Sequence, residues 1–148
     1  MIEKPKEARA DLEVQEQDKS PFNLIQEDYT HNPWRMMICC IFLNQTTNIQ
    51  VRKILSSFFG RFPNEHSIDE THVQEIAEMI KPLGLYNRRA NTIVKFCKGW
   101  ICGFKSVESL YGIGKYASDS WEIFLNKNYD IQVTDKKLKM YLDWKNTF

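Results

Sequence analysis

Apolar residues along most of this chain recur at intervals of three and four, the spacing of one face of an α-helix. The clearest examples are the segments 49–59, 73–80 and 86–101. Residues 33–43 are apolar nearly all round, which is typical of a helix buried in a core. No convincing pair of strands and no internal repeat is visible. Six or more helices with short connections predict a compact, all-α fold.

Prolines, glycines and capping residues mark where these helices begin and end. Ser20 as a cap and Pro21 at a first helical position predict a short helix through about Tyr29. Gly60 is expected to end the helix of residues 49–59. Further helices are expected over 106–110 and 115–125, and a last one that begins near Asp135.

Length and charge predict one folded domain behind a polar lead-in. The chain has 148 residues, of which 43% are hydrophobic, enough for one independent core. Residues 1–20 hold four basic and six acidic side chains and few large apolar ones, so we expect a disordered lead-in there and a domain over 21–148. Because the whole chain carries +1, that domain carries +3. A mildly basic body suits contact with a few phosphates, but charge alone favours an ordinary solvated surface.

The cysteines predict neither disulfides nor a metal site. Cys39 and Cys40 lie in an apolar run, as buried thiols do, and Cys97 and Cys102 are not at a usual zinc spacing. We therefore expect a reducing compartment, no metal and no cofactor. The charged start does not resemble a secretory signal, and no apolar run is long enough to span a membrane, so no membrane partner is expected.

A pair of glycines forms the most specific short motif. Gly112 and Gly114 enclose Ile113 between two expected helices. Glycines let the backbone turn tightly and bring main-chain amides close to an anion, and the helix that follows points its free N–H groups the same way. Ile113 can anchor the turn in the core. Taken alone, this pattern is also that of an ordinary helix-turn-helix.

Several separate stretches resemble a known family. The hairpin Leu-Tyr-Gly-Ile-Gly-Lys-Tyr at 110–116 resembles that of the base-excision DNA glycosylases related to endonuclease III. Residues 21–27, 41–44, 81–86 and 90–96 resemble, in order, the glycosylase domain of the methyl-CpG-binding thymine DNA glycosylases. The resemblance covers about residues 20–145. It implies a helix-hairpin-helix DNA glycosylase fold, which in this chain would lack an iron-sulfur cluster because no cysteine follows Cys102.

Asp135 is the expected catalytic residue. In the superfamily an essential Asp lies about 20 residues after the hairpin at the start of a later helix, and Asp135 stands 21 positions after Gly114. Asp130 and Asp143, at 16 and 29 positions, fit less well. A carboxylate there stabilises the positive charge that develops on the sugar and can orient or deprotonate the attacking water. Asp is also a common helix cap, and the two roles are compatible.

The resemblance also assigns the nature of the product. Family members that nick the strand carry a lysine two positions after the second hairpin glycine, where this chain has Tyr116. Lys115 is one position earlier, about 100° away around a helix, so it does not simply replace that amine. A monofunctional enzyme without lyase activity is therefore expected.

The remaining site residues are expected to bind the flipped base and the DNA. The resemblance places Gln26 and Tyr116 in the base pocket, Leu85 as the wedge beside the orphaned base, and Gln45, where the family commonly has Arg, as the plug after Leu43 and Asn44. Leu43 is also expected to contact the DNA. Each of these side chains also has an ordinary alternative as surface or core. Phosphate contacts are expected first from the hairpin and two lysines, and then from other basic residues: Gly112, Ile113, Gly114, Lys115 and Lys137, and then Arg88, Arg89, Lys136 and Lys139.

Together these features predict excision of thymine or uracil from G·T and G·U pairs in double-stranded DNA, by a monomer in the nucleus. Two alternatives stay open. The chain can be a noncatalytic DNA-binding protein that retains only the hairpin, or a glycosylase of the same fold that acts on another damaged base.

Overall fold

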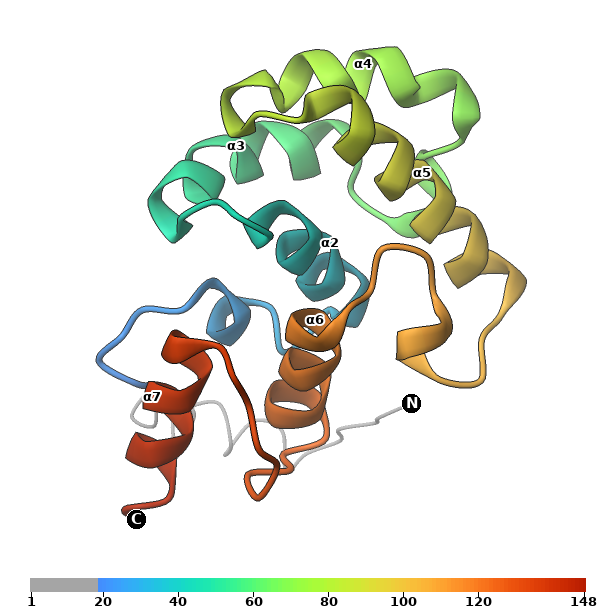
Figure 1. Ribbon diagram of the computed structural model, residues 1–148. Coiled ribbons are helices and arrows are strands. Elements are labelled where there is room, and N and C mark those ends of the chain that lie inside the picture. The colour runs from blue at the N-terminus through green and yellow to red at the C-terminus, as the bar shows by residue number, and fades with distance from the viewer. Residues whose placement is uncertain (1–18) are drawn as a thin grey trace, which may run out of the picture.

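Helices form all the regular structure in residues 19–148, the part of the chain that the computed structural model describes (Figure 1). The α-helices are α2 Pro33–Leu43, α3 Asn48–Arg61, α4 Val73–Met79, α5 Tyr86–Cys102, α6 Lys115–Ser120 and α7 Lys136–Lys145. Short 3-10 helices lie at Ile25–Asp28, Glu65–Ser67, Glu70–His72, Lys81–Leu83 and Val107–Ser109, and a π-helix at Trp121–Leu125. The all-α prediction is confirmed. The expected lead-in falls on residues 1–18, which lie outside the described part, and on Lys19 and Ser20.

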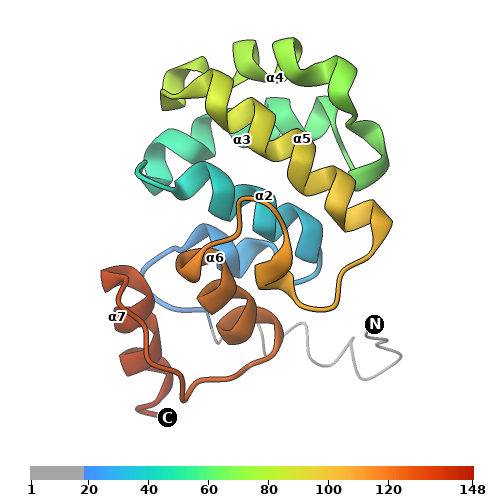
Figure 2. The ribbon, with the colours of Figure 1, turned by 45° about the vertical axis from the view of Figure 1, so that its right-hand side comes forward.

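Helix α2 lies at the centre and separates two groups of helices. In both ribbon views α3, α4 and α5 lie on one side of it, and α6 and α7 lie on the other (Figure 2). From Trp34 to Leu43 only Arg35 is not buried, as its all-round apolar sequence predicts. The core therefore continues through α2 from one group of helices to the other. The loop that follows the C-terminal end of α2 lies between the two groups.

The first expected helix is wrong in its extent. Residues 21–22 form a turn, and regular structure begins only with the 3-10 helix Ile25–Asp28. The Glu27 carboxylate accepts hydrogen bonds from the Ser20 N–H at 2.8 Å, the Ser20 hydroxyl at 2.6 Å and the Leu24 N–H at 3.1 Å. These local bonds, together with the left-handed backbone of Asn23 at φ 54°, compete with a continuous helix.

Helix α3 differs from its predicted bounds at both ends. It begins at Asn48 because Thr47 and Gln50 form a capping box, in which each side chain accepts from the other residue's N–H. Gly60 does not end it, since the helix runs on to Arg61. Phe62, which follows the last turn, is buried in the core, and its N–H donates to the Phe58 carbonyl at 2.8 Å, while the Arg61 guanidinium lies over the Phe62 ring.

A buried arginine joins α5 to the end of α2. Arg89 donates to the carbonyl oxygens of Gly84, Ile41 and Phe42 at 2.9, 3.3 and 3.2 Å. Only 6% of Arg89 is exposed. The expectation that Arg89 meets phosphate is therefore wrong, because its guanidinium is buried and committed to these three main-chain carbonyl oxygens.

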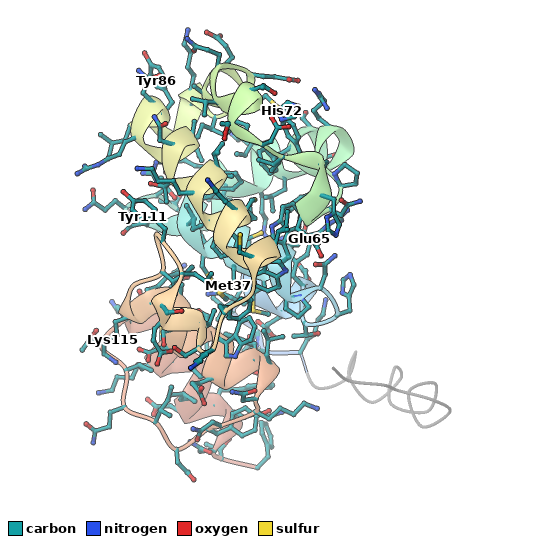
Figure 3. All side chains as sticks on the ribbon, turned by 90° about the vertical axis from the view of Figure 1, so that its right-hand side faces the viewer. Met37, Glu65, His72, Tyr86, Tyr111 and Lys115 are labelled. Carbon is teal, nitrogen blue, oxygen red and sulfur yellow. The ribbon has the colours of Figure 1, made fainter. Side chains whose placement is uncertain are left out.

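The hairpin and the last helix follow the predicted order. The expected segment 115–125 is α6 continued by the π-helix Trp121–Leu125, and α7 begins directly after Asp135. Tyr111 lies in the loop between α5 and α6, and Lys115 lies at the start of α6 (Figure 3). Across residues 19–148, none of the helices has the length and apolar character that crossing a bilayer requires.

Candidate active site

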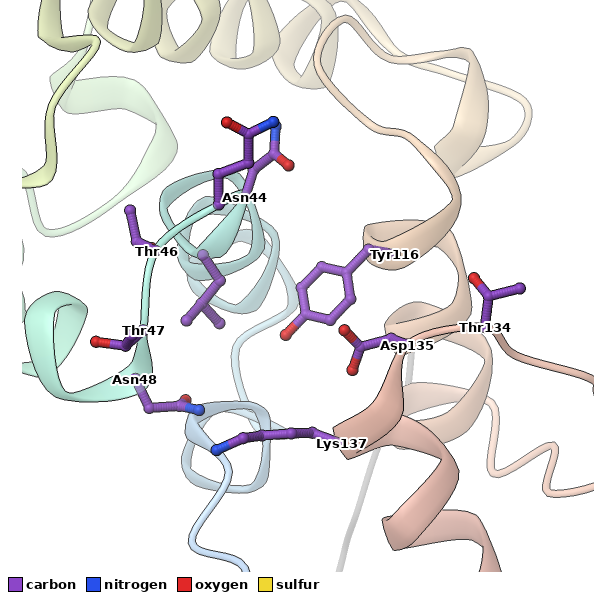
Figure 4. A pocket seen from close by; sticks show the side chains of 10 residues that line it. Asn44, Thr46, Thr47, Asn48, Tyr116, Thr134, Asp135 and Lys137 are labelled. Carbon is purple, nitrogen blue, oxygen red and sulfur yellow. The ribbon is translucent and has the colours of Figure 1, made fainter.

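A cavity of about 380 Å³ opens where the end of α2, the start of α3 and the start of α7 meet (Figure 4). This size is within the range of small-molecule pockets. Most of the residues that line it are polar, and they include one carboxylate and one amine. The lining residues are Leu43, Asn44, Gln45, Thr46, Thr47, Asn48, Tyr116, Thr134, Asp135 and Lys137. Sequence-predicted residues from three separate segments, at the end of α2, on α6 and at the start of α7, therefore meet at one place.

Asp135 is held in a fixed direction at this cavity. It is the N-cap of α7, and its Oδ2 atom accepts a hydrogen bond from the Leu138 N–H at 3.0 Å. The predicted helix start is thus confirmed. The other carboxylate oxygen has no hydrogen bond among the described residues, and the group lies beside the Tyr116 hydroxyl (Figure 4). A cap on a rigid helix keeps a carboxylate in place without occupying both oxygens.

Tyr116 presents a neutral phenol beside that carboxylate. Its hydroxyl accepts a hydrogen bond from the Gln26 side-chain amide at 2.7 Å, and the same amide donates to the Ser120 hydroxyl at 3.1 Å. Burial raises the pKa of the Tyr116 phenol well above its usual value, and nearby Cys40 and Asp135 raise it further. Gln26 is 1% exposed and lies behind Tyr116, outside the cavity wall, so in this structure it holds the phenol.

A second cavity of about 400 Å³ adjoins the first, and Tyr116 and Gln45 line both. Its wall includes the hairpin, the start of α5 and the thiol of Cys40, whose pKa burial raises to about 12. The thiol is therefore uncharged at neutral pH and a poor nucleophile.

Two exposed loop residues that line this second cavity, Gln45 and Leu85, have unusual backbone geometry. Gln45 has φ 67° and Leu85 has φ 48°, in the left-handed region that non-glycine residues rarely adopt. The Leu85 side chain is 54% exposed, although an apolar side chain favours burial. Strained backbone that holds polar and apolar side chains out at a cavity is typical of functional loops. Leu43, by contrast, is 8% exposed and forms part of the wall of the first cavity.

The structure requires a glycine at only one of the two hairpin positions. Gly112 has φ 86°, and a Cβ there would lie 2.5 Å from the Thr92 Cγ2 atom on α5. Gly114 has φ −100°, and no atom lies within 4 Å of the position of its Cβ. Ile113 is buried, as expected for an anchor, and its N–H donates to the Leu110 carbonyl at 3.2 Å. Ile113 therefore has neither its side chain nor its amide available to DNA in this structure.

The predicted lysines are placed differently from one another. Lys137 is exposed on the first cavity, and its amine extends toward Asn48 (Figure 4). Lys115 lines the second cavity, but its amine is paired with Asp119. Arg88 is exposed at the same cavity. Among residues 19–148 no group of three or more His, Cys, Asp or Glu side chains lies together as metal ligands would.

Sequence reasoning did not single out the start of α3 as part of this site. Thr47 and Asn48 line the first cavity with Thr46, next to the predicted plug Gln45. The Thr-x-x-Gln capping pattern was the available signal, because it fixes the start of α3 at Asn48, and that helix start lines the same cavity as Asp135.

A helical hairpin, a capped carboxylate after it and exposed loop residues beside the cavity define a helix-hairpin-helix repair domain. The chain belongs to the HhH-GPD superfamily of base excision DNA repair proteins, whose family model matches residues 38–143. The predicted kinship is thus confirmed.

Three similar proteins carry informative names. The chain is 38% identical, over 85% of its length, to a methyl-CpG-binding domain protein 4-like protein of Arabidopsis thaliana. It is 30% identical over 59% of its length to a thymine-DNA glycosylase of Aeropyrum pernix, and 32% identical over 60% to a thymine/uracil-DNA glycosylase of Methanothermobacter thermautotrophicus. The matched parts are 29%, 43% and 43% of these relatives, so the chain spans less than half the length of each.

Proposed function

We propose that this chain is a monofunctional DNA glycosylase that excises thymine or uracil from G·T and G·U pairs. The observation that carries the proposal is the Asp135 carboxylate, fixed by its cap on α7, at a cavity large enough to hold a base beside the hairpin helix. Relatives named as thymine and thymine/uracil glycosylases support the choice of base. The protein would work as a monomer on double-stranded DNA, in the nucleus.

The proposed chemistry needs only groups on this chain and water. As the C1′–N1 bond lengthens, its electron pair leaves with the pyrimidine and positive charge develops on the sugar. Asp135 stabilises that charge and accepts a proton from the water that attacks C1′. The uncharged Tyr116 adds no second negative charge and bounds the base site, while Gln45 and Leu85 fill the space that the flipped base leaves in the duplex.

Excision should depend on the mismatch. We expect abasic sites, revealed as strand breaks after alkali, in duplexes with G·T and G·U but not in matched duplexes with A·T, A·U or G·C. The reason is that a mispaired base costs less to unpair and flip. Gel analysis of end-labelled strands gives the measurement. Binding without abasic sites in any of these duplexes would favour the noncatalytic alternative, and excision of a different base would reassign the substrate.

The strand itself should remain intact before alkali is added. Tyr116 offers no amine to attack the sugar, and Lys115 is engaged with Asp119. We therefore expect that borohydride added during turnover traps no covalent complex of protein and DNA, while alkali shows abasic product in the same samples. A trapped adduct that grows with time would contradict the monofunctional assignment.

A further inference from the structure

One side chain hydrogen-bonds the segment that carries Asp135 to the hairpin helix, in addition to the apolar packing of both in the core. The Lys115 amine donates to the Asp119 Oδ2 atom at 2.8 Å and to the Gln132 carbonyl oxygen at 3.1 Å. Gln132 lies three positions before Asp135, in the loop that leads into α7. We propose that Lys115 is a positioning residue that holds Asp135 in register with Tyr116. This inference rests on the function proposed above and differs from the phosphate contact expected from the sequence.

Residues 126–134 form no regular structure, so individual hydrogen bonds and the packing of Ile131 and Val133 against the core hold this loop. The Asn128 N–H donates to the Glu122 carbonyl at 2.9 Å near the start of the loop, and the Asn146 side chain donates to the Tyr129 carbonyl at 3.0 Å in its middle. Of the hydrogen bonds described for this loop, the one at Gln132 is nearest to Asp135. Displacement of the loop end would therefore pass directly to the cap of α7.

Asp119 gives Lys115 its direction. It lies one helical turn after Lys115 on α6, and its side chain is only 13% exposed, whereas that of Lys115 is 55% exposed. A largely shielded carboxylate therefore holds a mobile ammonium on the side of α6 that faces the loop. Tyr116 is the next residue on the same helix. The hydrogen bond from Lys115 to Gln132 therefore holds α6, which carries the Tyr116 phenol, against the loop that leads to the Asp135 carboxylate.

Positioning matters more here than stability. Exposed ion pairs contribute little to the free energy of unfolding, so loss of Lys115 should leave the fold intact. Small misplacement of a reacting group, in contrast, strongly lowers the rate of the chemical step. A phosphate contact has the opposite signature: its loss weakens DNA binding and lowers the salt dependence of binding, with little effect on the step after binding.

The test separates the rate of excision from the affinity for DNA. We expect Lys115→Met to lower the single-turnover rate at saturating protein by roughly tenfold. Its dissociation constant for a duplex with a non-cleavable 2′-fluoro analogue of the target nucleotide, and the salt slope of that constant, should stay close to those of the unmodified chain. Lys115→Arg should restore much of the rate, because a guanidinium can donate to both Asp119 and Gln132. Asp119→Asn should lower the rate in the same direction as Lys115→Met.

Lys98→Met is the matched control, since Lys98 is an exposed lysine on α5 that lines neither cavity. It removes the same charge and should change neither quantity. The proposal is overturned if Lys115→Met excises at the full rate, or if it instead weakens binding and lowers the salt slope by about one unit.

A second measurement does not need activity. The Leu138 amide is protected by the Asp135 cap, so its hydrogen exchange reports how firmly Asp135 is held. We expect Lys115→Met to speed this exchange severalfold while amides at the centre of α2 keep their protection. Unchanged exchange would overturn the positioning role even if the chain excised no base. Faster exchange in an inactive chain would leave the positioning intact and contradict only the proposed function.

Discussion

Asp135→Asn is expected to lower the rate of base excision by roughly 100- to 1,000-fold, the usual effect of removing one group that stabilises charge in a transition state. An amide cannot neutralise the developing positive charge on the sugar or accept a proton from water. The side chain should still cap α7, because asparagine caps helices as well as aspartate does and its oxygen can accept from the Leu138 N–H. Single-turnover excision from a G·U duplex measures the loss, and the dissociation constant should remain nearly unchanged.

Asp143→Asn is the control for that experiment. Asp143 is an exposed carboxylate on the same helix, away from both cavities that Tyr116 lines. Its variant removes the same charge and should excise at the unaltered rate. Near-normal excision by Asp135→Asn, or an equal loss in both variants, would rule out Asp135 as the catalytic carboxylate.

The two hairpin glycines should respond very differently to valine. Gly112→Val is expected to destabilise the fold by about 2–4 kcal/mol, because its Cβ meets Thr92 at 2.5 Å and its backbone is left-handed. For a chain of this size that is roughly a 10 °C lower melting temperature. Gly114→Val has open space and an ordinary φ, so its melting temperature should change little.

DNA binding then becomes a clean test at Gly114. If the amides beside it approach a phosphate, Gly114→Val should weaken binding to matched and mismatched duplexes alike, since phosphate contacts do not read sequence. Binding is compared at one salt concentration, with thermal melting as the control for folding. A folded Gly114→Val protein with normal affinity would show that the hairpin only makes a turn, and equal melting of both variants would contradict the packing against Thr92.

The helices that the sequence predicts well are those with strong local signals. Pro33 after Asn32, the stripe of α5 and the position of Asp135 as a cap were each readable from a few neighbouring residues. The errors arose where a distant or competing contact decides the outcome. Gly60 stays helical because Phe62 beyond it is buried in the core and its N–H donates to the Phe58 carbonyl, and the segment after Ser20 turns because Glu27 accepts hydrogen bonds from the Ser20 and Leu24 amides.

The same distinction holds for the site. Asp135, Tyr116, Gln45 and Leu85 were expected from motif spacing and resemblance, and the structure places all four at two adjoining cavities. The positions of the basic residues could not be read in that way. Lysine and arginine look alike as surface charges in a sequence, and only the fold shows that the Arg89 guanidinium is buried.

Arg89 links the loop before α5 to the end of α2, so the two loops that carry Leu85 and Gln45 are held relative to each other. Its three bonds join the Gly84 carbonyl, next to Leu85, to the Ile41 and Phe42 carbonyls in the last turn of α2, a few residues before Gln45. The guanidinium therefore helps to hold the spacing between the two projecting side chains. Under the proposed function, the Gln45 and Leu85 side chains would enter the duplex together at one opened base step, because neither loop adjusts alone to a different spacing.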